Sequence, residues 1–96
     1  MSNVRDGTRL VAGSEYIAAG SNLLDPAVSL TIPVGARVAI IQAGTDDLRW
    51  TDDGSTTPTA TVGMLLAGGD SFLYTGELQK VQLFSANGGV NIHYYG

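Results

Sequence analysis

The clearest feature of the sequence is an alternation of apolar and polar residues with a period of two. Residues 28–32 place an apolar side chain at every second position, with hydroxylated residues between them. Residues 90–95 repeat the pattern, with Val90, Ile92 and Tyr94 on one side. Successive side chains of a strand point to opposite faces, so both segments are predicted to be strands with one buried face.

A different kind of strand is predicted at residues 36–42. Val38 and Ile40 share one face of this segment, and Ala39 and Ile41 share the other. Apolar residues on both faces are typical of a strand that is covered on both sides. We therefore expect residues 36–42 to form a central strand.

Short strands and turns account for most of the remaining chain. Further strands are predicted at residues 48–51, 62–66, 71–74 and 78–85, and residues 15–19 are either a short strand or one turn of helix. The glycines of residues 67–70 permit the positive φ of a tight turn and predict a hairpin. The Asn-Gly-Gly sequence at 87–89 predicts a type I′ hairpin.

Together these patterns predict an all-β fold of about seven to eight short antiparallel strands. A small β-sandwich, a jelly roll and a small barrel all fit, because strand order depends on long-range pairing that periodicity does not reveal. With 96 residues, the chain makes one domain that buries roughly 65% of its unfolded surface. Residues 1–13 are mostly polar and are predicted to be a flexible N-terminal arm, and residues 14–96 to be a single β domain.

Charge is sparse in this chain. Charged residues make up 15% of the sequence, below the ~25% that is common in soluble domains. So little charge is expected where part of the surface is buried against another subunit, although an ordinary β-rich surface explains it equally. The net charge is −4 and the five basic residues are scattered, which argues against a surface for nucleic acid.

The sequence also bears on the compartment in which the protein folds. It has no cysteine, as is usual for a protein that folds in a reducing cytoplasm. The N-terminal residues show no apolar leader, and nowhere do about 18 apolar residues run together. We therefore expect neither a signal peptide nor a membrane partner.

Few residues could carry chemistry. His93 is the single histidine, and no cysteine accompanies it to make a metal cluster or a nucleophile. The carboxylates of Asp46, Asp47, Asp52 and Asp53 could converge on calcium, but their spacing is not that of an EF-hand and aspartates in turns ordinarily cap their own backbone. The prediction is a protein that is not an enzyme and needs no metal or cofactor.

The candidate binding residues lie around the one tryptophan. Arg49 and Trp50 are of the two residue types that dominate interface energetics, and Asp52 and Asp53 follow them at the start of a polar loop. These four residues are our predicted partner interface. A single tryptophan is equally expected in a core, so both roles stay open for Trp50.

Four blocks of sequence carry a resemblance to a known family. They read RWTDDG at 49–54, TPTATVGM at 57–64, GDSFLY at 69–74 and NIHYY at 91–95. The chain resembles, over about residues 33–95, a family of small proteins encoded by tailed bacteriophages and prophages among their virion structural genes. The resemblance implies an accessory virion component, such as a capsid decoration (cement) protein or a small neck or tail factor.

The resemblance implies partners and a location as well. The partners would be the major capsid protein or other virion proteins, with the chain itself forming a homo-oligomer. The protein would be made in the cytoplasm of the bacterial host and end in the virion. The main alternative from another class is a carbohydrate-binding β-sandwich that stacks sugars on Trp50, Tyr74, Tyr94 or Tyr95.

Overall fold

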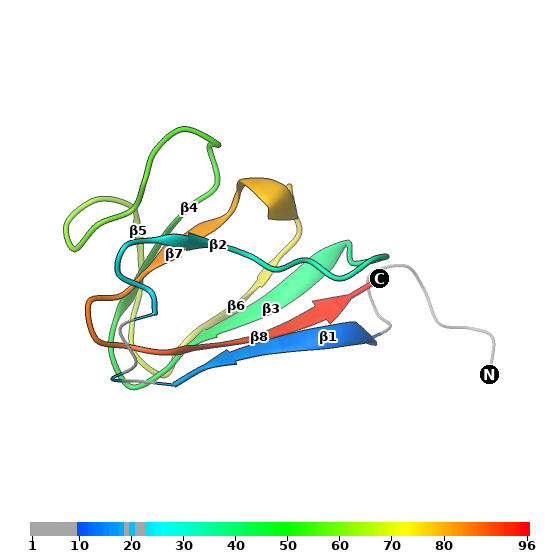
Figure 1. The fold of residues 1–96 in the computed structure, drawn as a ribbon, viewed down its shortest axis with the longest axis horizontal. Coiled ribbons are helices and arrows are strands. Elements are labelled where there is room, and N and C mark those ends of the chain that lie inside the picture. The colour runs from blue at the N-terminus through cyan, green and yellow to red at the C-terminus, as the bar shows by residue number, and fades with distance from the viewer. Residues whose placement is uncertain (1–9, 19, 21–22) are drawn as a thin grey trace.

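The chain folds into short strands joined by turns, as a computed structural model shows for residues 10–18, 20 and 23–96 (Figure 1). One short 3-10 helix, η1, interrupts the strands. The elements are β1 Leu10–Ile17, β2 Val28–Ser29, β3 Val38–Ala43, β4 Leu48–Thr51, β5 Met64–Leu66, β6 Ser71–Tyr74, η1 Leu78–Lys80, β7 Gln82–Phe84 and β8 Val90–Tyr95. No helix among these residues is long and apolar enough to cross a membrane.

The strands form two four-stranded antiparallel sheets. Sheet A has the order β1-β8-β3-β6, and sheet B has the order β2-β7-β4-β5. The prediction of an all-β fold of short antiparallel strands is therefore confirmed, and the two sheets form a small sandwich and not a barrel. The chain pairs as one long antiparallel hairpin, in which the first four strands run alongside the last four. The pairs are β1·β8, β2·β7, β3·β6 and β4·β5. This rolled hairpin has the strand order of a jelly roll.

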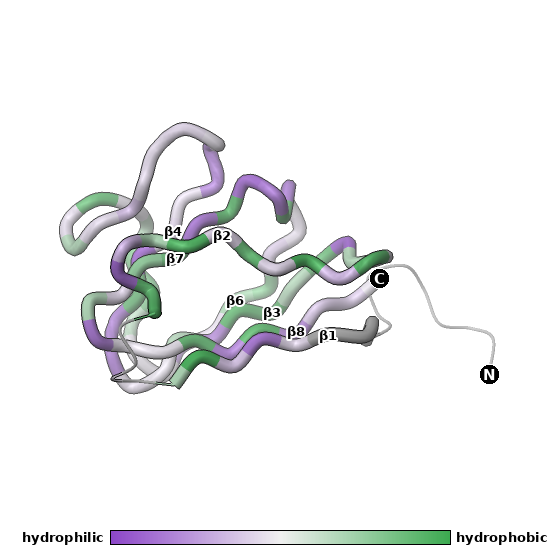
Figure 2. Tube along the Cα trace, in the orientation of Figure 1, coloured by the Kyte–Doolittle hydropathy of each residue, from purple (hydrophilic) through white to green (hydrophobic). Residues whose placement is uncertain are grey.

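The core lies between the two sheets and is built by the alternation that the sequence shows. On β8, Val90, Ile92 and Tyr94 are buried, while the residues between them are half-exposed. Ala39 and Ile41 of β3 are fully buried beside them. In Figure 2 the tube alternates between hydrophobic and hydrophilic colours along β8, whereas β3 is hydrophobic over most of its length.

Residues 36–42 were predicted to form a central strand covered on both faces. The central position is right, but only one face is covered. Strand β3 is an inner strand of sheet A, between β8 and β6. Its outward residues Ile40 and Gln42 are exposed, however. The reason is that a two-sheet sandwich covers only the inner face of each sheet, and no described element crosses the outer face of sheet A.

The two predicted hairpin turns are also wrong. Residues 67–70 join β5 of sheet B to β6 of sheet A, and residues 87–89 lie between β7 of sheet B and β8 of sheet A. These turns pack together at one end of the sandwich, where the N–H of Gly44 donates to Gly89 O at 3.0 Å and the N–H of Gly69 donates to Gly44 O. A side chain at Gly68 would overlap the carbonyl oxygen of Thr45, so glycine is required for this close approach.

Several element boundaries differ from the sequence prediction. The segment 28–32 is a strand only at Val28–Ser29, and the segment 62–66 only at Met64–Leu66. The predicted strand at 78–85 begins with the 3-10 turn η1, and only Gln82–Phe84 form the strand β7. The predicted arm at 1–13 ends earlier, because β1 begins at Leu10 and pairs with Tyr95 across the otherwise open edge of β8. Residues 1–9 of that arm lie outside the described residues.

Candidate functional site

Trp50 lies at the seam between the two sheets. Its ring stacks on Phe72 of β6, with ring centroids 4.9 Å apart and an interplanar angle of 21°. Tyr74 meets it edge-on, with centroids 6.1 Å apart. Trp50 is half-buried and packs against the core, so it holds sheet B onto sheet A near the edge of the sandwich.

Arg49 faces the opposite way, because successive residues of a strand alternate sides. It pairs with Phe84 on β7 and with Leu65 on β5, on the outer surface of sheet B. Its Nη1 donates a hydrogen bond to Gly63 O at 2.9 Å, which fixes the guanidinium against the end of the loop 52–63. Arg49 and Trp50 therefore do not share a surface.

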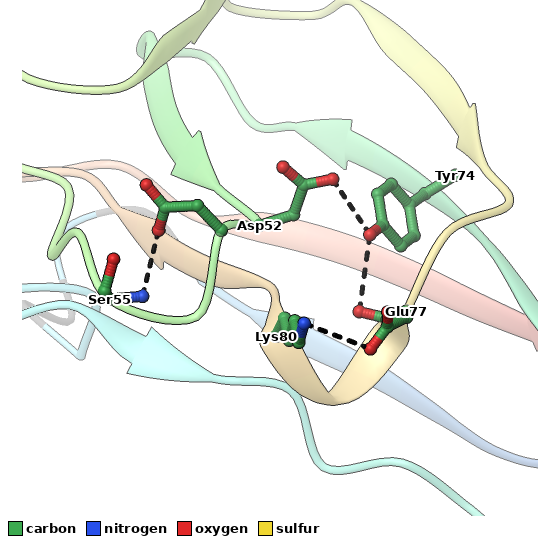
Figure 3. A network of polar contacts seen from close by, with 6 residues as sticks. Asp52, Ser55, Tyr74, Glu77 and Lys80 are labelled. Atoms are coloured by element: carbon green, nitrogen blue, oxygen red, sulfur yellow. Dashed lines mark hydrogen bonds and ion pairs between the residues drawn. The ribbon is translucent and has the colours of Figure 1, made fainter.

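Asp52 is engaged within the domain. The buried hydroxyl of Tyr74 lies 3.0 Å from Asp52 Oδ2, to which it donates, and 3.3 Å from Glu77 O (Figure 3). Burial first, and then the hydrogen bond to Asp52, raise the pKa of Tyr74 to about 12. An exposed ion pair between Lys80 and Glu77, 3.3 Å long, lies beside this network.

Asp53 shapes its own loop. Its Oδ1 accepts hydrogen bonds from the N–H groups of Ser55 at 3.0 Å and Thr56 at 2.8 Å. The hydrogen bonds from Thr56 and then Ser55 lower the pKa of Asp53 from 3.8 to about 2. The hydroxyl of Thr51 donates to Thr56 O at 2.7 Å, so the first half of the loop is tied down at both ends.

The open edge of the sandwich carries apolar side chains. Strand β5 ends sheet B and strand β6 ends sheet A, so each has one side without a partner strand in the described part of the chain. Met64 is 61% exposed and Leu65 55% exposed. We call the apolar edge the exposed residues on or beside these two strands: Val62, Met64, Leu65 and Leu73.

A hollow of about 220 Å³ adjoins this edge on the outer surface of sheet B. Its apolar lining comes from Leu65, Phe84 and Ala60, and its charged lining from Arg49 and Asp47. The loop 52–63 contributes Ala60 and thus forms one wall. The hollow and the apolar edge share Leu65 and make one candidate interaction surface.

The structure thus separates the four residues of the predicted interface. Arg49 lies in the candidate surface, Trp50 joins the sheets, and the carboxylates of Asp52 and Asp53 bond to groups of the domain itself. Sequence reasoning missed Leu65 as an exposed residue. The adjacent pair Leu65 and Leu66 contained the information needed to find it. Adjacent residues of a strand cannot both face one core, so one of the two leucines had to face outwards.

The residues first considered for binding calcium or sugars are poorly placed to do so. Within the described ranges, no group of three or more His, Asp and Glu side chains could hold a metal ion. Asp47, one of the calcium candidates, accepts a hydrogen bond from the N–H of Gly68 at 2.9 Å. Of the aromatic residues proposed for sugar stacking, Tyr74 and Tyr94 are buried and Trp50 packs on Phe72.

No protein-family model, curated protein or solved structure matches this chain.

Proposed function

We propose that the protein is a non-enzymatic structural component of a tailed-phage virion, a capsid decoration protein that binds the shell as multiple copies. The observation that carries the proposal is the apolar edge with its adjoining hollow. The four sequence blocks that resemble phage virion proteins support it independently, and three of them contribute to this region through residues 49–54, 57–64 and 69–74.

The apolar edge is a surface that needs a partner. A strand at the end of a sheet presents unpaired N–H and C=O groups, and soluble monomers protect such edges with lysine, proline or charge. Strand β5 instead exposes Met64 and Leu65, and the neighbouring Arg49 is turned towards Gly63 O. A second protein that covers this edge would bury the apolar side chains and pair the free backbone groups.

The energetics of such a contact suit a protein that acts in many copies. Burying a leucine or methionine side chain fully is worth about 1.5–3 kcal/mol before the cost of association is subtracted. One copy with an edge of this size would bind weakly. Many copies that contact the shell and each other would hold firmly, because each contact raises the effective concentration for the next.

The first test is the number of copies per virion. Quantitative mass spectrometry of purified particles should find hundreds of copies, in a fixed ratio to the major capsid protein. About a dozen copies or fewer would contradict a shell-covering role and indicate the neck or tail. Finding none would exclude the virion altogether.

The second test is a charge placed on the apolar edge. Leu65→Lys should reduce co-sedimentation with undecorated shells by at least about tenfold, because burial of an ammonium group there costs more than the apolar contact it replaces. Val34→Lys is the matched control, since Val34 is fully exposed on a turn away from this edge. Equal shell binding by the two folded variants would refute the assignment of this surface.

A further inference from the structure

The outer face of sheet A carries a row of polar side chains that lies outside the candidate interaction surface. Strand pairing places Tyr16 of β1 beside Asn91 of β8, Asn91 beside Gln42 of β3, and Gln42 beside Ser71 of β6. The four residues therefore lie side by side across the whole sheet. We call them the polar row.

The next row of the same face is more apolar. Ser14 lies beside His93, His93 beside Ile40, and Ile40 beside Leu73. Neither row contains an acidic residue, a lysine or an arginine. A ligand of this face is therefore selected by shape and hydrogen bonding, and an uncharged one fits best.

Tyr16 is held in a defined orientation although it is 65% exposed. Its hydroxyl and Nε2 of His93 are 2.6 Å apart and share a hydrogen bond. The two rings meet edge to face, with centroids 5.7 Å apart and an interplanar angle of 70°. An exposed aromatic ring fixed in this way is a platform on which an apolar molecular face can stack with little loss of side-chain entropy.

Asn91 and Gln42 fix each other in a similar way. Nδ2 of Asn91 donates to Oε1 of Gln42 at 3.2 Å. An amide side chain has two donor hydrogens and an acceptor oxygen, so this single bond leaves the second N–H and Oδ1 of Asn91 and the whole NH₂ group of Gln42. No described residue takes up these groups, and they face the solvent beside the hydroxyl of Ser71.

The residues of both rows enclose an open hollow of about 170 Å³. Its lining is Ile40, Gln42, Ser71, Asn91 and His93. Pockets for drug-sized ligands measure roughly 300–1,000 Å³, so this hollow suits one small ring or the end of a chain of such rings. Tyr16 is not part of this lining but lies beside two of its residues, Asn91, with which it pairs, and His93, with which it shares a hydrogen bond.

We propose that the outer face of sheet A is a binding site for a neutral saccharide. A pyranose ring has an apolar face of C–H groups, which would stack on Tyr16, and a rim of hydroxyls, which both donate and accept hydrogen bonds. The amides of Asn91 and Gln42 and the hydroxyl of Ser71 supply the complementary donors and acceptors. Leu73 belongs to the apolar edge and also ends the second row of this face, but it does not line the hollow, so the saccharide site does not depend on the role proposed for that edge.

The test is an NMR titration of the full ¹⁵N-labelled chain with glucose, galactose, mannose and N-acetylglucosamine. At least one sugar should shift the amide signals of residues 40–42, 71 and 91–93, with a dissociation constant on the order of 1 mM, as expected for a ligand of this size. No shift with any of these sugars or with their short oligomers, or shifts confined to sheet B, would overturn the proposal.

Variants then locate the contact. Tyr16→Ala should weaken binding of that sugar about tenfold by removing the stacking surface, whereas Tyr16→Phe should keep most of the affinity. Gln42→Ala should also weaken it, and Gln79→Ala, which removes another exposed glutamine on η1, should not. Unchanged binding by the folded Tyr16→Ala protein would overturn the site, and so would a loss of shell binding in that variant, since sheet A would then be a protein contact.

Discussion

At the scale of single residues, two buried tyrosines tie distant parts of the chain together through their hydroxyls. Tyr94 of β8 donates to Glu15 Oε1 of β1, and the same oxygen accepts the N–H of Thr31 at 2.7 Å. Tyr74 of β6 donates to Asp52 at the end of β4. Burial, and secondly the hydrogen bond to the carboxylate, raise the pKa of each tyrosine above 10.

These tyrosines predict a loss of stability at alkaline pH. The folded protein holds both phenolic protons more tightly than the unfolded chain does, so their contribution is complete below pH 10 and is lost as the pH rises through the folded-state pKa, about 12 for Tyr74. The melting temperature, followed by circular dichroism, should fall steeply above pH 10. The fall should be shallower in Tyr74→Phe and shallowest in the double variant with Tyr94→Phe.

The double variant supplies the decisive comparison for this pH dependence, because it removes only these two phenols and leaves the other titratable groups in place. A limb that is equally steep in the Tyr74→Phe and Tyr94→Phe double variant would show that other groups cause the alkaline unfolding.

At the scale of elements, the sequence predicted strands better than their connections. The period-two pattern located β8 and its buried face, because burial of alternate residues is a local property. It mistook residues 87–89 for a hairpin, since the same turn residues can join strands within one sheet or between two. Which of these occurs is decided by pairing between strands far apart in sequence, such as β8 with β1 and β3.

The candidate surface was predictable in part for a similar reason. Arg49 was recognised from its residue type and lies in the hollow. Leu65 looked like a core residue, because hydrophobicity alone does not tell the inner from the outer face of a short strand. The hydrogen bonds of Asp53 to the backbone of its own loop follow from the ordinary capping role of aspartate in turns, whereas the hydrogen bond between Tyr74 and Asp52 joins residues far apart in sequence, which local patterns do not predict.

Strand β1 yields a prediction at this scale. Removal of residues 1–9 keeps the whole of β1, which begins at Leu10, and serves as the reference for a deeper deletion. Removal of residues 1–17 should unfold the domain or lower its melting temperature strongly, since β8 would lose its edge partner and Tyr94 its acceptor Glu15. An unsatisfied buried hydroxyl alone costs about 1–3 kcal/mol.

Glu15→Gln separates the two effects of that deletion. The variant keeps the strand and keeps an oxygen that accepts the hydrogen bond from Tyr94, but it removes the charge. It should therefore be far more stable than the chain without residues 1–17. If both proteins melted at the same temperature, the side chain of Glu15 and not the pairing of β1 would be the source of the stability.

At the scale of the whole molecule, the rolled hairpin determines how the chain can fold. Strands β4 and β5 are the one pair of sequence neighbours that share a sheet, and the other pairings join strands that are increasingly distant in sequence. Closing a larger loop costs more conformational entropy, and folds dominated by distant pairings fold in milliseconds to seconds. Folding is therefore expected to begin at β4 and β5 and to finish with β1 on β8.

This order can be measured by stopped-flow folding of two core variants. Leu66→Ala on β5 should mainly slow folding, because its contacts form early. Ile92→Val on β8, which should cost about 0.5–1.5 kcal/mol, should mainly speed unfolding. Both side chains are buried, so each variant should lower the stability enough for the changes in the folding and unfolding rates to be compared with it. The opposite assignment of rates would place the nucleus at the outer pair.

The pairing of Leu10 with Tyr95 also determines how the domain would respond to mechanical force. The start of β1 and the end of β8 lie side by side at one end of sheet A. A pull on these two positions therefore separates β1 from β8 one hydrogen bond at a time. The domain should therefore yield at low force when it is held at Leu10 and Tyr95, because no stage of this opening loads several hydrogen bonds together.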